Sequence, residues 1–391
     1  MSSLATEAPI DVNGVIVPSR PGRRVLAVLR DAGASVPTLC FDDRLEPQGT
    51  CRMCLVEVEV DGRVETVASC TALSEPGMSV RTHTDEIVEY RKILLEMLLS
   101  EIEDPFRTSQ AAALGNHEFQ AAVREYGAQA DTFNPIECRA KADDLNPFIS
   151  RDYDLCISCF RCTNICNDWE QASAITVAGR GQDSTIFSKF NNLLMESPCT
   201  FCGQCVNTCP TGALSNRKMA GTITPAPMGW NADSPPEATI SIPAPSGDTV
   251  QLGPETSVHR TSTICPYCGV GCGINLITQD GELVGSEPDF SAPSLGSLCV
   301  KGQFGSWDFI NSDERLKTPL IKNAHGEFEP VSWDTALALI SDKLKHYRDV
   351  NGPDSLVFWS SARTTSESNY LAQKFTRVAL GTNNVDNCSR T

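Results

Sequence analysis

Apolar and polar positions in the first hundred residues predict a small mixed domain. Residues 10–17 read as a strand, and residues 23–32 carry apolar groups at helical spacing. Residues 55–60 and 63–67 alternate apolar and polar positions on either side of Asp61-Gly62, a dipeptide that strongly favours a tight hairpin turn. The pattern therefore predicts a strand, a helix and a β-hairpin that share one core.

A longer helix is predicted to close this domain. Residues 85–100 place apolar side chains at helical spacing, and Thr84 is suited to cap the N-terminus of the helix. We therefore expect one domain over residues 9–100. The following residues 101–150 form a connector with a helical stretch near 117–126 and little obvious chemistry.

The rest of the chain divides at a proline-rich stretch. Residues 221–258 hold seven prolines and few large apolar residues, which predicts a semi-rigid linker. Beyond the linker, short strands and longer helices predict an α/β unit over residues 259–391. Its expected elements are strands over 273–277 and 282–285, helices over 333–350 and 369–380, and a buried strand over 355–359 that feeds a helix.

Composition narrows the classes of function. The chain has 391 residues, of which 41% are hydrophobic and 21% charged, so it can bury real cores and should form two or three domains. No stretch approaches the roughly 18 consecutive apolar residues that a membrane span needs. The net charge of −17 opposes binding to phosphate backbones, so nucleic acid and anionic membrane surfaces are poor partners.

The most informative count is 18 cysteines against 5 histidines. Cysteine makes up about 5% of the chain, below the roughly 8–10% of a small disulfide scaffold. Arg23-Arg24 precedes an apolar run that Arg30 and Asp31 break after five residues, which favours a helix inside a domain over an export signal. We therefore expect a cytoplasmic protein whose thiols are metal ligands rather than disulfides.

Sixteen of the cysteines fall into four groups of four, each in its own stretch of sequence. Only Cys138 and Cys388 stand apart. We predict that the grouped cysteines ligate metal: Cys40, Cys51, Cys54 and Cys70; Cys156, Cys159, Cys162 and Cys166; Cys199, Cys202, Cys205 and Cys209; Cys265, Cys268, Cys272 and Cys299.

The third group has the spacing Cys-x2-Cys-x2-Cys-x3-Cys-Pro, and the second group repeats it with Asn167 in place of the proline. In this spacing three cysteines wrap one 4Fe–4S cluster and the fourth ligates the other cluster. Structural zinc and disulfides are the alternatives, but zinc prefers two separated cysteine pairs. The segment over residues 151–220 looks like a bacterial two-cluster ferredoxin. The predicted ligand sets are crossed: Cys156, Cys159, Cys162 and Cys209 for one cluster, and Cys199, Cys202, Cys205 and Cys166 for the other.

The first group has a gap of ten residues, then a close pair, then a distant fourth cysteine. Its central stretch, Gly49-Thr-Cys-Arg-Met-Cys-Leu-Val-Glu-Val58, is similar to the N-terminal 2Fe–2S domain of the complex I large iron–sulfur subunit, which NAD-linked hydrogenases and formate dehydrogenases share. The resemblance implies a β-grasp ferredoxin fold with one 2Fe–2S cluster. A zinc site is the alternative, since one close pair and two distant ligands could also close a tetrahedron.

The fourth group, Cys265-Pro-Tyr-Cys-Gly-Val-Gly-Cys272 followed by Cys299-Val-Lys-Gly302, resembles the opening of the catalytic domain in molybdenum or tungsten bis-pterin oxidoreductases. In that family a 4Fe–4S cluster sits beside the pterin, and a lysine placed like Lys301 lies between them. An ordinary surface lysine is the alternative.

The tail from Arg363 to Arg390 resembles the stretch just upstream of the cysteine or selenocysteine that ligates molybdenum in formate dehydrogenases. The resemblance implies cofactor contacts from Lys301 and Arg363, a structural role for Cys388, and a catalytic residue immediately after Thr391.

Residues 9–391 as a whole resemble the N-terminal part of the α subunit of NAD-linked cytoplasmic formate dehydrogenases. The fold class implied is α+β and multidomain: a β-grasp 2Fe–2S domain, a two-cluster 4Fe–4S ferredoxin domain and the start of an α/β molybdopterin oxidoreductase domain. One departure is that relatives carry a further cluster on one histidine and three cysteines. His117 keeps part of that pattern without the cysteines, so we expect this cluster to be absent and Cys138 to be a lone buried thiol.

The resemblance implies oxidation of formate to carbon dioxide, or the reverse, at a molybdenum or tungsten bis-pterin centre of a longer chain. Electrons would pass through one 2Fe–2S and three 4Fe–4S clusters. Because the sequence has no credible dinucleotide fingerprint, NAD and flavin are expected on a diaphorase-type partner subunit.

Three explanations of the chain's end are open: a selenocysteine codon read as stop, a fragment of a cysteine enzyme, or an electron-transfer subunit without a catalytic centre. A nitrate reductase of the same pterin family is a further alternative.

Overall fold

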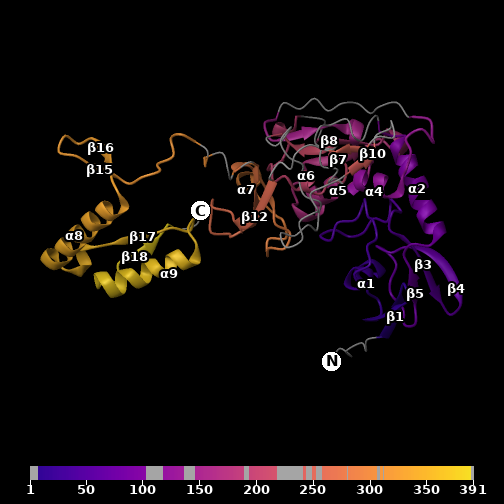
Figure 1. Ribbon diagram of the computed structural model, residues 1–391, viewed down its shortest axis with the longest axis horizontal. Coiled ribbons are helices and arrows are strands. Elements are labelled where there is room, and N and C mark those ends of the chain that lie inside the picture. Colours follow the sequence, from indigo (N-terminus) through magenta and orange to yellow (C-terminus); the bar gives the residue numbers. More distant parts are fainter. Residues whose placement is uncertain are drawn as a thin grey trace. The chain divides into compact units, whose positions relative to one another are not determined.

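The computed structural model describes residues 8–102, 118–135, 146–188, 193–217, 241–243, 249–251, 258–279, 281–305, 309–310 and 312–388 (Figure 1). The predicted linker therefore lies largely outside the described residues, and so do part of the connector, His117 and Cys138. The chain forms two compact units. One comprises Met1–Glu255 with Ser297–Val300, and the other comprises Thr256–Gly296 with Lys301–Thr391.

The first unit begins with a five-stranded mixed sheet covered by one helix. The strands are β1 (Ala8–Val12), β2 (Val15–Ser19), β3 (Leu55–Val60), β4 (Arg63–Ala68) and β5 (Ser79–Arg81), in the order β2-β1-β5-β3-β4. Strands β1 and β5 are parallel and the other neighbours antiparallel. Helix α1 (Val25–Asp31) packs its apolar side on the sheet. The shared core is Ile10, Val12, Val25, Val28, Leu29, Val56, Val58, Met78 and Val80.

The prediction of a single strand over 10–17 is wrong, because the chain turns back at Asn13-Gly14. Both residues have positive φ (53° and 90°), and the Gly14 amide donates to Asp11 Oδ1 at 2.6 Å. The predicted hairpin at Asp61-Gly62 has the same backbone, with φ of 51° and 75°. Two-residue turns with φ positive at both positions match the twist of the flanking strands, so both dipeptides make hairpins.

Helix α2 (Asp85–Leu99) begins where the sequence predicts it. The Thr84 hydroxyl accepts from the Ile87 amide at 3.4 Å and caps the first turn. The helix packs against α4 (Glu118–Tyr126). Arg91, fully buried on α2, donates to the carbonyl oxygens of Met53 (3.1 Å) and Leu55 (2.7 Å). Helix α2 thereby holds the loop that leads into β3.

Short elements make up the cysteine-rich part of the first unit. Two antiparallel pairs, β6 (Ile149–Arg151) with β9 (Leu214–Asn216) and β7 (Ile175–Ala178) with β8 (Thr185–Ser188), are joined by small helices and loops. The helices are α5 (Arg161–Asn164), which runs into a π-turn over Ile165–Trp169, and α6 (Gln204–Asn207), with 3₁₀ turns at Tyr153–Leu155, Gly181–Asp183 and Leu194–Glu196. A further strand pair, β10 (Ser241–Pro243) and β11 (Thr249–Gln251), follows.

The second unit starts with an antiparallel meander of β12 (Val258–Ile264), β13 (Gly273–Gln279) and β14 (Glu282–Pro288). Helix α7 (Val300–Phe304) and the hairpin of β15 (Leu320–Lys322) and β16 (Phe328–Pro330) come next. The last part is α/β: β17 (Phe358–Ser360) and β18 (Val385–Asn387) are parallel, with α8 (Trp333–Asn351) and α9 (Ser366–Phe375) as helices.

The prediction of a buried strand over 355–359 is wrong in two respects. Residues Pro353–Ser355 form a 3₁₀ turn, so the strand begins only at Phe358. The Trp359 side chain is 83% exposed, because no further layer among the described residues covers that face of the strand pair. The helix predicted over 369–380 begins earlier, at Ser366, capped by Thr365, and continues through a π-turn over Thr376–Leu380. No helix in the described part of the chain is long and apolar enough to span a membrane.

Candidate metal centres

The first cysteine group converges between the sheet and the loop that precedes β3. The Cys51 amide donates to Cys40 Sγ at 3.5 Å, and the sulfur atoms of Cys54 and Cys70 lie 3.3 Å apart. Arg52 has positive φ (59°) and turns the chain between the close pair. Cys54 directly precedes β3 and Cys70 follows β4, so the β-hairpin itself brings these two cysteines together.

Hydrogen bonding divides these four thiols into two pairs. The Cys51 side chain lowers the pKa of Cys40 to about 5, and the Cys70 side chain lowers the pKa of Cys54 to about 7. The same bonds raise the pKa values of Cys51 and Cys70, and burial raises them further. A thiolate is the form of cysteine that binds metal. The thiolate is therefore favoured at Cys40 and is more accessible at Cys54 than at an ordinary cysteine, and each of these two lies beside a thiol that a metal would deprotonate.

The second and third groups line two small, mainly apolar cavities. One is lined by Cys156, Cys159, Cys162 and Cys209. The other is lined by Cys166, Cys199, Cys202 and Cys205. Each cavity thus gathers three cysteines from one loop and the fourth from the other, in the crossed combination that the spacing predicts. The buried Tyr153 lines both cavities, and its hydroxyl oxygen accepts from Arg151 Nη1 at 3.3 Å.

The two loops repeat one backbone conformation. Ser158 and Phe160 have φ of 54° and 60°, and the equivalent Phe201 and Gly203 have φ of 52° and 75°. In both loops the amide two residues after the first cysteine donates to the sulfur of that cysteine. The Ser158 amide donates to Cys156 Sγ at 3.5 Å, and the Phe201 amide donates to Cys199 Sγ at 3.4 Å. Left-handed turns of this kind point successive amides into a concavity that suits an anionic group.

Burial determines the pKa values of the thiols in these cavities. It raises the pKa values of Cys159, Cys162 and Cys205 and raises that of Cys202 to about 12. Neutral thiols in an apolar, water-poor cavity need a metal to become thiolates. Four sulfur donors, apolar walls and amides aimed at sulfur fit an iron–sulfur cluster, whose potential depends on hydrogen bonds to the sulfurs and on solvent exposure.

The fourth group is divided between the two compact units. Cys265 and Cys272 lie at adjoining ends of β12 and β13, and the Cys265 amide donates to the Cys272 carbonyl oxygen at 2.8 Å. Gly269 approaches the chain so closely that a Cβ atom would lie 2.3 Å from the Ala362 carbonyl oxygen. Cys299 is exposed just before α7 and belongs to the first unit. This ligand set therefore stays a prediction.

The predicted pterin contacts are exposed. Lys301 lies on α7, and the Arg363 amide donates to Ser361 Oγ at 3.0 Å. The Ser361 hydroxyl, and then the Ala362 amide that donates to Cys388 Sγ at 3.4 Å, lower the pKa of Cys388. Sequence reasoning missed a set of buried charges in the first unit, namely Asp42, Arg44 and Arg161.

Large apolar side chains are exposed over the last α/β elements. Parallel strands are ordinarily covered on both faces, and helices bury an apolar stripe. In the second unit these side chains instead face solvent: Trp333, Leu337, Ile340, Tyr347 and Val350 on α8, Trp359 on β17, and Tyr370, Leu371 and Phe375 on α9. The faces of these elements are suited to be covered by additional protein.

Family models match four successive parts of the chain. Residues 6–85 match a 2Fe–2S iron–sulfur cluster binding domain, and residues 146–215 match the ferredoxin-like domain of NADH-quinone oxidoreductase subunit 3. Residues 258–312 match the molybdopterin oxidoreductase Fe4S4 domain, and residues 315–391 match a molybdopterin oxidoreductase domain. These matches confirm the predicted fold class, α+β and multidomain.

Curated relatives and a solved structure agree with these matches. Proteins of Staphylococcus aureus strains MRSA252 and USA300, each named "Putative formate dehydrogenase", are 33% identical over 385 residues, which is 95% of this chain. The chain spans 38% of the length of these relatives. An NAD⁺-reducing [NiFe]-hydrogenase in the H₂-reduced state matches 57% of this chain and 92% of the hydrogenase chain, with a TM-score of 0.50 and 27% identity.

The matched domains follow one another along the chain in a defined order. An iron–sulfur front end of the NADH-quinone oxidoreductase type precedes the Fe4S4 segment and the following part of a molybdopterin oxidoreductase. The chain therefore carries domains of the 2Fe–2S, ferredoxin-like and molybdopterin oxidoreductase families, and over this length it is similar to proteins named as putative formate dehydrogenases.

Proposed function

We propose that this chain is the electron-transfer portion of a formate dehydrogenase α subunit. The observation that carries the proposal is the crossed lining of the two ferredoxin cavities, each with four cysteines from two loops. This arrangement serves two adjacent cubane clusters and has no advantage for separate zinc ions.

We assign the sixteen grouped cysteines to four clusters. The first group would hold a 2Fe–2S cluster, and each crossed set of the ferredoxin segment would hold a 4Fe–4S cluster. The group from Cys265 to Cys299 would hold a third 4Fe–4S cluster, as the Fe4S4 family model supports. These clusters supply one-electron redox chemistry when bound.

The chain's own residues provide the environment for that chemistry. Amides of Cys51, Ser158 and Phe201 donate to cysteine sulfurs, and the Ala174 amide donates to Cys166 Sγ at 3.4 Å. Apolar side chains around the cavities exclude water: Ile149, Ile165 and Leu194 at one, and Ile157 and Ile186 at the other. Fixed hydrogen-bond donors and an apolar lining would keep the surroundings of each cluster unchanged while the charge of the cluster changes.

Formate is proposed as the substrate because the curated relatives carry that name. A molybdenum or tungsten bis-pterin centre would lie in a longer form of this protein, with Lys301 and Arg363 on the side that faces the pterin. The exposed apolar faces of α8 and α9 support this, since additional domain structure would cover them.

An NAD- and flavin-binding partner subunit is proposed as the electron acceptor. The similarity to an NAD⁺-reducing hydrogenase and to an NADH-quinone oxidoreductase domain supports an NAD-linked complex. The reducing conditions that free thiols and iron–sulfur clusters need favour a cytoplasmic location.

Single-cysteine variants test the crossed ligand sets. Replacing Cys209 with Ala should remove the cluster that Cys156, Cys159 and Cys162 help to hold. The cluster on Cys166, Cys199, Cys202 and Cys205 should stay intact. Cys166→Ala is the matched control and should do the reverse. Iron content and the EPR signals of the reduced protein are measured for both variants. The crossed assignment would be overturned if Cys209→Ala removed the cluster of Cys199, Cys202 and Cys205 instead, and Cys166→Ala removed the cluster of Cys156, Cys159 and Cys162.

A further inference from the structure

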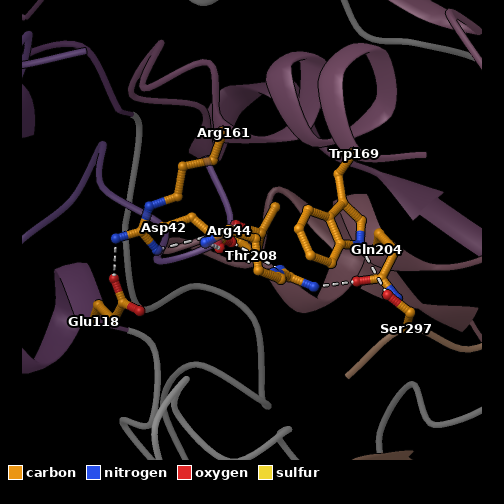
Figure 2. A network of polar contacts seen from close by, with 8 residues as sticks. All are labelled: Asp42, Arg44, Glu118, Arg161, Trp169, Gln204, Thr208 and Ser297. Carbon is orange, nitrogen blue, oxygen red and sulfur yellow. Dashed lines mark hydrogen bonds and ion pairs between the residues drawn. The ribbon is translucent and has the colours of Figure 1, made fainter. Parts of the chain in front are cut away.

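Arg161 joins three segments that lie far apart in the sequence, and Figure 2 shows it with its partners Glu118 and Thr208. Its guanidinium donates to the carbonyl oxygens of Thr38 at 3.1 Å and Thr208 at 3.3 Å, and forms an ion pair with Glu118 at 2.7 Å. Thr38 lies two residues before Cys40, and Thr208 directly precedes Cys209. One side chain therefore ties the 2Fe–2S loop to the ferredoxin segment and to α4.

A second set of polar contacts is centred on Asp42 and Arg44. Asp42 accepts from Arg44 Nε at 2.9 Å and Nη2 at 2.8 Å, and from Thr208 Oγ1 at 2.7 Å. Arg44 Nη1 donates to Gln204 Oε1 at 2.5 Å, and Figure 2 shows Trp169 beside this arginine. Asp42 and Arg44 form the ion pair of this second set of contacts, with 2.8 Å between Arg44 Nη2 and Asp42 Oδ2.

The charge of Arg161 is buried. Its side chain is 1% exposed and that of Glu118 23% exposed. A charge in a site of low effective dielectric acts strongly on nearby charges. In the sequence the closest metal-site cysteines are Cys159 and Cys162, on either side of Arg161.

The two metal sites that Arg161 connects also share one hydrophobic core. Leu39 and Met53, beside cysteines of the first group, belong to the same buried cluster as Leu155 and Ile157, beside Cys156. Four of the cysteines themselves pack against this cluster: Cys51, Cys156, Cys159 and Cys209. The loops that Arg161 joins are therefore packed on one apolar core.

We propose that the Arg161–Glu118 ion pair sets the reduction potential of the 4Fe–4S cluster on Cys156, Cys159, Cys162 and Cys209, and that Arg161 positions the Cys40 loop against this cluster. The inference rests on the proposed function, since it requires both clusters. Arg161 is a positioning residue, because it contacts the loops of the ligands through carbonyl oxygens.

The sign of the effect follows from charge. Reduction adds one electron and no compensating proton to a buried cluster, and the electron comes from the neighbouring carrier, which is oxidised by one. A buried cation stabilises the reduced state and raises the potential, whereas a buried anion lowers it. Removing Arg161 leaves Glu118 without this partner, and removing the Glu118 charge leaves Arg161 without its partner, so the two variants should shift the potential in opposite directions.

The test is an EPR-monitored redox titration of the full chain purified without oxygen. At a fixed solution potential, Arg161→Met should lower the ratio of reduced to oxidised cluster by about tenfold, which for one electron is about 59 mV. Glu118→Gln should raise that ratio by a similar factor. The double variant should have a ratio close to that of the unmodified protein. Arg161→Lys, which keeps the charge, should restore most of the potential.

Two controls separate this role from a structural one. Arg30→Met removes a charge from the exposed Arg30–Asp43 pair, whose side chains are 43% and 67% exposed, and should leave the ratio unchanged. The cluster on Cys166, Cys199, Cys202 and Cys205 should shift less than its neighbour in every variant. Should Arg161→Met fail to fold, Glu118→Gln still decides the sign.

The outcomes distinguish the two proposals. Absence of 4Fe–4S signals from the unmodified protein would refute the proposed function. Intact signals with unchanged ratios in both Arg161→Met and Glu118→Gln, or shifts of the same sign in both, would overturn the role of the ion pair alone.

Discussion

Replacing Asp42 with Asn should open the loop around Cys40. The Asp42 side chain is fully buried and that of its partner Arg44 is 6% exposed. The carboxylate accepts three hydrogen bonds from Arg44 and one from Thr208. Asparagine has the same shape but no charge, so Arg44 would be left as a buried cation without its anionic partner.

The magnitude follows from that burial. Removing one member of a buried ion pair costs about 3–5 kcal/mol. We expect the lower end, about 3 kcal/mol, because the asparagine oxygen can still accept one bond. At 1.4 kcal/mol per factor of ten, local opening should become more than about 100-fold more frequent.

Hydrogen–deuterium exchange of peptides covering the Cys40 loop measures this opening directly. Asp43→Asn is the matched control, since Asp43 is the next residue and its ion pair with Arg30 is exposed. An exposed pair contributes about 0–1 kcal/mol, so this variant should exchange at most about fivefold faster. Equal protection in the two variants would refute the claim that the Asp42–Arg44 pair holds the loop.

Three further predictions concern other parts of the chain. Burial raises the pKa of Asp42, but Arg44 and Thr208 outweigh it and hold this pKa below its ordinary value of 3.8. The stability that Asp42 contributes is therefore present above pH 4 and lost as pH falls further, and unfolding of the Asp42→Asn variant should depend less on acid. Gly269→Ala would place Cβ 2.3 Å from the Ala362 carbonyl oxygen and should lower the iron content; unchanged iron would contradict this. Thr84→Ala should cost about 1 kcal/mol in thermal unfolding, and an unchanged melting temperature would argue against the cap.

Local signals in the sequence predicted local structure well. The cap at Thr84 and the turn at Asp61-Gly62 depend on residues within a few positions, and both occur where predicted. The turn at Asn13-Gly14 carries the same kind of signal, but the apolar residues on both sides of it resemble one continuous strand. The crossed lining of the two cavities agrees with the spacing of the two runs, in which the fourth cysteine of each run lines the cavity of the other run.

Long-range polar contacts left no comparable signal. Asp42 and Thr208 are 166 residues apart, and Arg161 and Thr38 are 123 apart. No periodic pattern distinguishes these charges from solvated ones, since a single arginine or aspartate in a loop is ordinarily exposed. The exposure of Trp359 also could not be predicted from the sequence. An apolar strand predicts burial but does not indicate which element covers it.

Metal analysis of the anaerobically purified chain tests the central claim most directly. The four ligand sets predict about 14 irons per chain with matching acid-labile sulfide, no stoichiometric zinc, and visible absorption that bleaches on reduction. About four zinc ions per chain without visible absorption would contradict the account, because the cysteine groups would then be structural zinc sites.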